Sequence, residues 1–154
     1  MSNLKAKEIT GKILTAFYTV YKELGYGFLE KVYENAMLVE LRRSGLRTGQ
    51  QVPIQVYYDG HEVGQYFADL AVEHAVIIEV KVADAICDAH EAQLINYLKA
   101  TDAEVGLVLN FGPKPEFMRR VFSNERKRQR HRDASMAVPV GDVELDDVDS
   151  SDPR

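Results

Sequence analysis

Two short runs of strand-forming residues, separated by only three residues, place the strongest constraint on how this chain can fold. Residues 67–72 (FADLAV) and 76–81 (VIIEVK) are rich in aliphatic side chains, yet each run carries an acidic residue. If the three residues between them form a hairpin turn, counting back along both strands places Asp69 directly opposite Glu79. Directly opposed residues have Cβ atoms about 4.5–5.5 Å apart, where two carboxylates repel one another unless a cation lies between them.

Lys81 lies two positions beyond Glu79 and therefore projects from the same face of the predicted hairpin. The intervening aliphatic residues point to the opposite face, where they can enter a core; they are Ala68, Leu70, Ile78 and Val80. An aspartate, a glutamate and a lysine on one face of an otherwise aliphatic hairpin predict a divalent-metal site with an adjacent ammonium group.

This interpretation depends on the length of the turn. A turn of two or four residues would put Asp69 and Glu79 on opposite faces of the sheet and remove the site. A simpler interpretation is that Asp69 ends a strand at the rim of the sheet, while Glu79 and Lys81 form an exposed ion pair. A third interpretation is a buried cluster of the same three charges with a structural role only.

The rest of the chain shows the periodicities of helices and of further strands. Helices are predicted at residues 4–24, 29–43, 84–100 and 115–128, and strands at 52–58, 61–72, 76–81 and 104–111. The dipeptide Asp59-Gly60 is a two-residue turn signal between the first two strands. This order predicts a mixed α/β fold, in which an antiparallel meander is followed by a crossover helix and a parallel strand, with helices flanking the sheet.

Length and charge divide the chain into one domain and a tail. A chain of 154 residues, 45% of them hydrophobic, predicts a single folded domain, residues 1–132. The segment 114–132 carries 8 Lys or Arg against 2 acidic residues, which indicates either a phosphate-contacting segment or a solvated helix. Residues 133–154 carry 1 basic and 7 acidic residues and few large apolar ones, which predicts a disordered acidic tail.

Neither a membrane span nor a disulfide is predicted. No run approaches the roughly 18 apolar residues of a membrane-spanning helix, and the N-terminal segment lacks the apolar core of a signal peptide, so we expect a cytoplasmic protein. The single cysteine, Cys87, excludes an internal disulfide, and its alanine and isoleucine neighbours predict a small buried side chain. The sequence leaves the oligomeric state open, a homo-oligomer included.

The predicted third helix supplies two more candidate site residues. Gln93 and Tyr97 are four residues apart, so they share a face of that helix and can point back toward Lys81. The alternative is that Tyr97 packs in the core while Gln93 bonds a nearby backbone group.

The predicted second helix carries Glu30 and Glu34 beside an apolar stripe, so one carboxylate can reach inward toward the sheet. We favour Glu30, because it directly follows the apolar entry Gly27-Phe28-Leu29, which indicates burial close to the core. Stabilisation of the helix dipole is the alternative explanation for an acidic residue in a first turn.

Three short motifs in these segments resemble those of known proteins. Residues 27–33 (GFLEKVY) resemble the motif that names the GxxExxY proteins, and Asp69 with residues 79–81 (EVK) resembles the D…(D/E)xK signature of the PD-(D/E)XK nuclease superfamily. Residues 93–97 (QLINY) are similar to the QxxxY motif of exonuclease-like branches of that superfamily. The resemblance runs from about Ile9 to Val121.

The chain departs from the family pattern at two positions. Ala68 precedes the aspartate where the superfamily name has proline, and Tyr21 stands where many relatives have histidine. The change at Ala68 is common among members, whereas the change at Tyr21 bears on what the first helix contributes to a site.

The resemblance implies a restriction-endonuclease-like core and a site for Mg²⁺ or Mn²⁺. Carboxylate and carbonyl oxygens are the ligands these hard cations prefer. The metal ligands implied by the resemblance are Asp69, Glu79, the Val80 carbonyl and Glu30.

The same resemblance implies nuclease chemistry, with nucleic acid, and DNA in the first place, as the partner. Lys81 would be the catalytic lysine, orienting or deprotonating the attacking water, while Gln93 and Tyr97 would position Lys81 or the nucleic-acid backbone. The alternative function is a catalytically inactive nuclease-fold module that binds nucleic acid or regulates through the basic segment 114–132.

Overall fold

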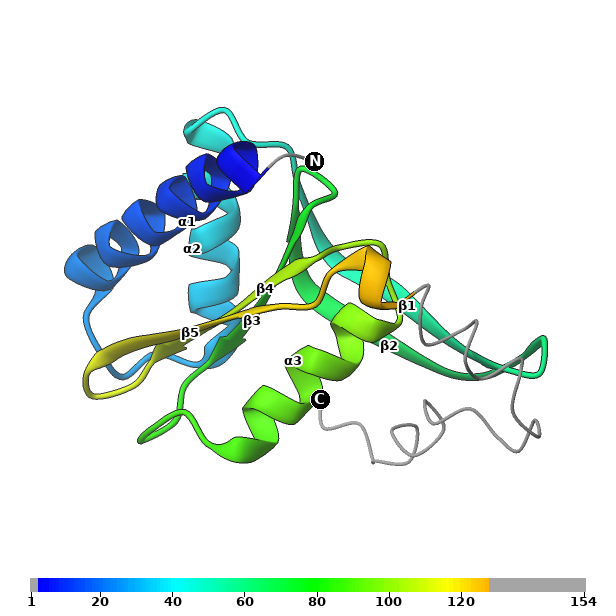
Figure 1. Ribbon diagram of the computed structural model, residues 1–154. Helices are drawn as coiled ribbons and strands as arrows, with labels where there is room; N and C mark the ends of the chain where they lie inside the picture. Colours follow the sequence, from blue (N-terminus) through cyan, green and yellow to red (C-terminus); the bar gives the residue numbers. More distant parts are fainter. Residues whose placement is uncertain (1–2, 128–154) are drawn as a thin grey trace.

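The protein folds around a five-stranded sheet in the order β1-β2-β3-β4-β5, and the structure, a computed structural model, describes residues 3–127 (Figure 1). The helices are α1 (Asn3–Leu24), α2 (Glu30–Arg43) and α3 (Asp88–Lys99), and the strands are β1 (Thr48–Tyr58), β2 (His61–Val72), β3 (Val76–Lys81), β4 (Val105–Phe111) and β5 (Pro115–Val121). Helices α1 and α2 cover one face of the sheet and α3 covers the other (Figure 1).

The predicted helix boundaries agree with glycines that adopt left-handed backbone conformations. Helix α1 ends before Gly25 (φ 70°), whose amide donates to the Tyr21 carbonyl, and α2 ends before Gly45 (φ 83°). Such conformations cost glycine little because it has no Cβ atom. Within residues 3–127, no helix combines the length and the apolar character needed to cross a membrane.

The turn between β2 and β3 has the odd length on which the predicted site depends. Val72 pairs with Val76 and Leu70 with Ile78, and the Ala75 amide closes the turn by donating to the Val72 carbonyl at 2.9 Å. Continuing this antiparallel register by one residue brings Asp69 opposite Glu79. The predicted hairpin register is therefore the observed one.

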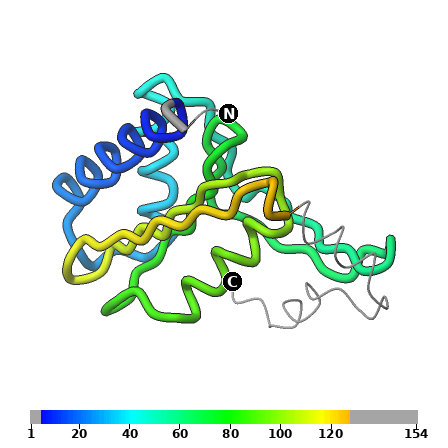
Figure 2. Tube along the Cα trace, in the orientation of Figure 1, coloured from blue at the N-terminus to red at the C-terminus, as the bar shows by residue number. Residues whose placement is uncertain are grey.

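The remaining strands complete the predicted mixed sheet. Strand β3 runs parallel to β4, with α3 as the connection between them, so the predicted crossover is confirmed. The β1–β2 hairpin turns at Asp59 (φ 51°) and Gly60 (φ 78°), as the Asp-Gly signal predicts, and its far end extends beyond the other strands (Figure 2).

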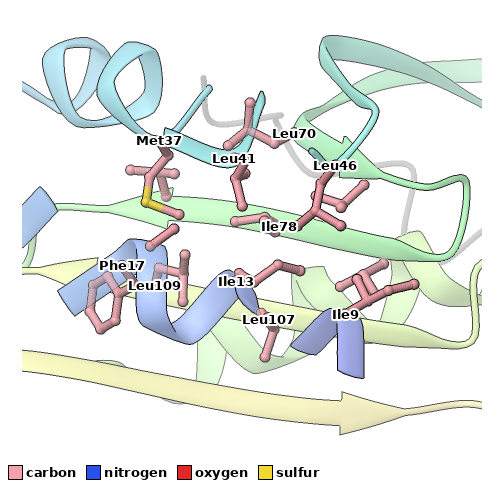
Figure 3. Packing of buried hydrophobic residues seen from close by; sticks show 14 of the residues in the cluster. Ile9, Ile13, Phe17, Met37, Leu41, Leu46, Leu70, Ile78, Leu107 and Leu109 are labelled. Atoms are coloured by element: carbon pink, nitrogen blue, oxygen red, sulfur yellow. The ribbon is translucent and has the colours of Figure 1, made fainter. Parts of the chain in front are cut away.

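Two apolar cores cover the two faces of the sheet. Val76, Ile78 and Val80 point into the core beneath α1 and α2, whose labelled members in Figure 3 interdigitate between helices and strands. Ile77 points the other way, into the core beneath α3. Since side chains alternate along a strand, Glu79 and Lys81 continue the α3-facing row that Ile77 begins.

One member of the predicted aliphatic face belongs to the other core. Ala68 packs in the α3-side core, whereas Leu70 packs beneath α1 and α2. The pairing of β2 with β3 ends at Leu70, and beyond that point β2 pairs with β1 alone. The simple alternation of faces does not hold across this junction.

The last predicted helix is wrong over most of its length. Residues 115–121 form β5, which pairs antiparallel with β4, and only residues 124–127 are helical. The charges that suggested a solvated helix also suit an exposed edge strand. Pro115 is tolerated because it is the first residue of β5, where the missing amide hydrogen costs no hydrogen bond between strands. Residues 128–132 of the predicted basic segment and the predicted tail, 133–154, lie outside the described residues.

The third helix begins later than predicted, and its start corrects the prediction for Cys87. Cys87 is exposed and forms the N-cap of α3, where its amide donates to the His90 Nδ1 atom at 3.1 Å. Ala85 and Ile86 lie in the connecting segment and Ala89 lies in the first turn of α3, and the prediction of a buried cysteine was wrong.

Candidate functional site

Asp69 and Glu79 meet where the β2–β3 ladder ends, and each side chain bonds the backbone of the opposite strand. The Asp69 amide donates to Glu79 Oε2 at 3.0 Å, and the Val80 amide donates to Asp69 Oδ2 at 2.8 Å. Both residues are buried, with only 6% of Asp69 and 2% of Glu79 exposed. Two neighbouring carboxylates withdrawn from water are costly unless donors or a cation compensate their charge.

Lys81 follows Glu79 on the same strand face and reaches α3. Its ammonium group donates to Gln93 Oε1 at 3.4 Å, and Gln93 Nε2 donates to the Tyr97 hydroxyl at 3.0 Å. Tyr97 is itself buried and packs against the Tyr66 ring, with 5.7 Å between centroids. The structure thus brings Gln93 and Tyr97 toward Lys81, in the arrangement that their four-residue spacing predicts.

Glu30 reaches the end of β3 from the first turn of α2. Its carboxyl group accepts a hydrogen bond from the Val82 amide. Desolvation raises the pKa of Glu30, and Asp69 raises it further, while the neighbouring positive charge of Lys81 opposes the increase. The Glu30 carboxyl group is therefore within electrostatic reach of Asp69 and Lys81. Its side chain is exposed, as are those of Phe28 and Leu29, so the burial predicted from the apolar entry to this helix was wrong.

The entry to α2 is held by Tyr33, which is fully buried. Its hydroxyl donates to the Gly25 carbonyl at 2.5 Å and accepts from the Phe28 amide at 3.2 Å. The ring stacks on Phe111 of β4, with 4.5 Å between centroids. Tyr33 therefore fixes the loop between α1 and α2, which directly precedes Glu30.

Tyr21 of α1 ties a second loop to this end of the sheet. Its hydroxyl donates to the Gly112 carbonyl at 2.6 Å, in the turn between β4 and β5. Desolvation, followed by the neighbouring Tyr33 and Tyr26, raises the pKa of Tyr21. Tyr21 therefore contributes a hydrogen bond between α1 and the β4–β5 turn.

Sequence reasoning did not select two groups that support the site from α2 and β1. Glu34 is buried, with 3% exposed, and its Oε2 atom accepts from Lys31, Gln50 and Gln51. Gln51 also donates to Asp69 Oδ1 at 3.3 Å. The spacing of Glu34 on the α2 stripe was a usable signal, whereas nothing in the sequence indicates where the Gln51 side chain points.

Asn110 is a third supporting residue, and it had a signal in the sequence. It is the single polar residue of the buried strand β4 and pairs in register with Lys81. Its side chain accepts from the Ala83 amide at 2.9 Å and donates to the Ala83 carbonyl at 3.0 Å. Asn110 therefore locks the chain that leaves β3 onto β4, just beyond Lys81.

Comparison with known proteins identifies the family of this arrangement. The family model of the PD-(D/E)XK nuclease superfamily matches residues 7–121, which include all the site residues described above. The chain belongs to the PD-(D/E)XK nuclease superfamily. Among solved structures it is similar to the "Crystal structure of SSO0001", at 16% identity and a TM-score of 0.49, over 69% of this chain and 56% of that one. No curated protein matches the sequence.

Members of this superfamily are typically metal-dependent nucleases, and the donors at the strand end have the right chemistry for Mg²⁺ or Mn²⁺. Asp69, Glu79 and Glu30 supply hard carboxylate oxygens from three elements. They do not form a preassembled cage: within residues 3–127 no three or more His, Cys, Asp or Glu side chains are grouped closely enough to hold a metal ion. The donor set fits a cation that keeps several waters, as Mg²⁺ usually does.

Proposed function

We propose that this member of the superfamily is a Mg²⁺- or Mn²⁺-dependent nuclease that hydrolyses phosphodiester bonds of DNA. The observation that carries the proposal is the meeting of Asp69 and Glu79 at the ladder end, with the Lys81 ammonium on the same strand face. Two buried carboxylates at opposed strand positions are an expensive way to stabilise a hairpin, and a cation beside them would offset that cost.

In this proposal Asp69, Glu79 and the Val80 carbonyl hold the cation, and Glu30 contributes directly or through a water molecule. A bound Mg²⁺ or Mn²⁺ neutralises charge on the phosphate and lowers the pKa of water bound to it. The raised pKa of Glu30 supports its part, because a partly desolvated carboxyl group beside Asp69 gains most from a nearby cation.

Lys81 would hold the attacking water in line with phosphorus and donate to the phosphate oxygens as negative charge grows on them. A bond forms between the water oxygen and phosphorus while the bond to the leaving oxygen breaks, the attacking water gives up a proton to solvent, and the leaving oxygen takes one up from solvent. Gln93 supports this role, since its amide donates to Tyr97 and therefore presents its carbonyl oxygen to the Lys81 ammonium.

We also propose that the chain belongs with the GxxExxY proteins. The motif residues act together: Gly27, with φ 122°, lies in the loop before α2, Glu30 bonds the end of β3, and Tyr33 fixes that loop. Each of the three residues that name the motif therefore has a separate structural role.

A catalytically inactive module remains the second candidate, and one observation favours it. Asp69 and Glu79 both accept hydrogen bonds from backbone amides, which satisfies part of their demand without a cation. Part of the basic surface assigned to such a module is the edge strand β5, where Arg119 and Arg120 lie. Arg120 pairs with Glu91 at 2.6 Å, so its charge is partly compensated.

Substitution of Lys81 distinguishes the two candidates. For a nuclease, Lys81→Met should abolish Mn²⁺-dependent cleavage of linear and circular DNA while Mn²⁺ binding persists, because lysine is not a metal ligand. Lys12→Met, on an exposed position of α1, is the matched control and should cleave like the wild type. If the wild type binds Mn²⁺ and DNA without cleaving under any of these conditions, the inactive module is the correct function.

A further inference from the structure

Gln51 adopts an unusual backbone conformation beside the candidate site. It lies inside strand β1 with φ 51°, in the left-handed region that side-chain-bearing residues rarely adopt. Its neighbours are paired, Gln50 with Leu70 and Val52 with Ala68, so Gln51 stands at the position opposite Asp69. Backbone strain of this kind costs about 1–3 kcal/mol and persists only where the surroundings hold it in place.

The side chain of Gln51 joins two carboxylates that come from different elements. Its Nε2 atom donates to Glu34 Oε2 at 3.0 Å and to Asp69 Oδ1 at 3.3 Å. An amide nitrogen carries two hydrogens, so it can serve both oxygens at once. The Val80 amide donates to the other oxygen of Asp69, at 2.8 Å, so donors from β1 and β3 hold the carboxylate from both sides.

Glu34 acts as the anchor of this amide. Lys31 bonds the same Glu34 oxygen at 3.0 Å and Gln50 bonds it at 2.7 Å, so the buried carboxylate is compensated locally. Glu34 therefore has no need of a cation, and it holds the Gln51 amide in place by accepting one hydrogen bond from Nε2. The second hydrogen bond that Nε2 donates orients the Asp69 carboxylate.

A neutral amide suits this position better than a charged donor. Lysine or arginine beside Asp69 would neutralise the carboxylate and compete with a cation for it. A neutral amide orients the carboxylate without adding a positive charge of its own. Partners of this kind, which hold a metal ligand without touching the metal, typically change metal affinity about 10–100-fold when they are removed.

We infer that Gln51 is a positioning residue for the cation site, which anchors on Glu34 and sets the Asp69 carboxylate in the orientation that binds the metal. This inference rests on the proposed function, because it assigns Gln51 a role toward the cation that Asp69 is proposed to hold. The proposed role gives a reason why a glutamine occupies this strained backbone position within β1.

The test is calorimetric titration of Mn²⁺ into the full-length protein and into Gln51→Met, which keeps the side-chain length but removes the donor. The matched control is Gln50→Met, since the Gln50 amide bonds the same Glu34 oxygen but directs its second hydrogen bond to Asn35 Oδ1. We expect the Kd for Mn²⁺ to rise about tenfold or more in Gln51→Met and to stay within about twofold of the wild type in Gln50→Met. Thermal unfolding without metal reports any loss of stability common to both.

Three outcomes count against the inference. Equal Mn²⁺ affinity in the wild type and in Gln51→Met overturns it while the proposed function stands. If Mn²⁺ binds equally weakly to both variants, the loss comes from their shared contact with Glu34 or from lower fold stability, and not from Asp69. If the wild type binds no Mn²⁺, the proposed function and this inference both fail. Should Gln51→Met not fold, Gln51→Gly, which suits the left-handed backbone and also lacks the donor, replaces it in the same titration.

Discussion

Asn110 offers the clearest test of how the fold supports the site, because its side chain is fully buried and its contacts are few. It makes one hydrogen bond with the Ala83 amide, at 2.9 Å, and one with the Ala83 carbonyl, at 3.0 Å. A third bond, to Glu116 Oε1, is long at 3.5 Å, and water can replace it because Glu116 is exposed. In Asn110→Ala the two bonds to Ala83 are lost, and the two backbone groups of Ala83 lose their side-chain partner.

The expected cost follows from those two bonds. A buried polar group that loses its partner costs about 1–3 kcal/mol, so two groups would cost about 2–6 kcal/mol if water were excluded. Ala83 is only partly buried, so water can reach it, and the lower part of that range applies. We therefore expect Asn110→Ala to lower the free energy of unfolding by about 2–3 kcal/mol, which a domain with about 5–15 kcal/mol of stability survives.

Urea unfolding followed by circular dichroism measures this difference directly. The matched control is Thr15→Ala, which removes one exposed hydrogen bond to the Gly11 carbonyl and should change the free energy of unfolding by no more than about 0.5 kcal/mol. Because Asn110 pairs with Lys81 across the sheet, Asn110→Ala should also lower kcat for DNA cleavage while it remains folded. If Asn110→Ala is as stable as Thr15→Ala, the bonds between Asn110 and Ala83 do not stabilise the fold as expected.

Three further predictions test the site and its surroundings. The pKa of Glu30 is raised in the folded protein, so its ionisation opposes folding, and the free energy of unfolding should fall as pH rises from 4.5 through the folded pKa. Glu30→Gln should not show this fall and should be more stable than the wild type at pH 7, which thermal melts of both proteins would measure. The same variant should bind Mn²⁺ more weakly in a titration. Gly112→Ala should destabilise by about 1–3 kcal/mol, because a Cβ atom would lie 2.0 Å from the Ala83 carbonyl oxygen, whereas Gly11→Ala, with nothing within 4 Å, should stabilise by up to about 1 kcal/mol in the same urea assay. Burial lowers the pKa of Lys127 to about 8, so the wild type should gain stability relative to Lys127→Met between pH 8 and 10.5, and parallel curves across that range would contradict this.

The hairpin at the centre of the site could be predicted because its register follows from the odd number of residues in the turn. A three-residue turn and two-residue alternation are enough to place Asp69 opposite Glu79 and Lys81 on the same face as Glu79. The positions of Gln93 and Tyr97 followed equally from helical spacing. In each of these cases the geometry is local, so it depends on few contacts.

The missed features depend on contacts between distant segments. Residues 115–121 carry a charge pattern that a helix and an edge strand can both solvate, and only pairing with β4 decides between them. The direction of the Gln51 side chain depends on a left-handed backbone conformation held by Glu34 and Asp69, which lie 17 and 18 residues away. No periodicity encodes such a conformation.

Calorimetric titration of Mn²⁺ into the wild type, Asp69→Asn and Glu79→Gln tests most directly whether the two carboxylates bind a common cation. Glu73→Gln is the matched control from the same hairpin, because Glu73 lies in its turn and pairs with Arg47. The wild type and Glu73→Gln should bind Mn²⁺ with equal affinity, while each site variant should lose about tenfold or more. Equal binding by all four proteins, or none by the wild type, would contradict the metal site and the nuclease function built on it.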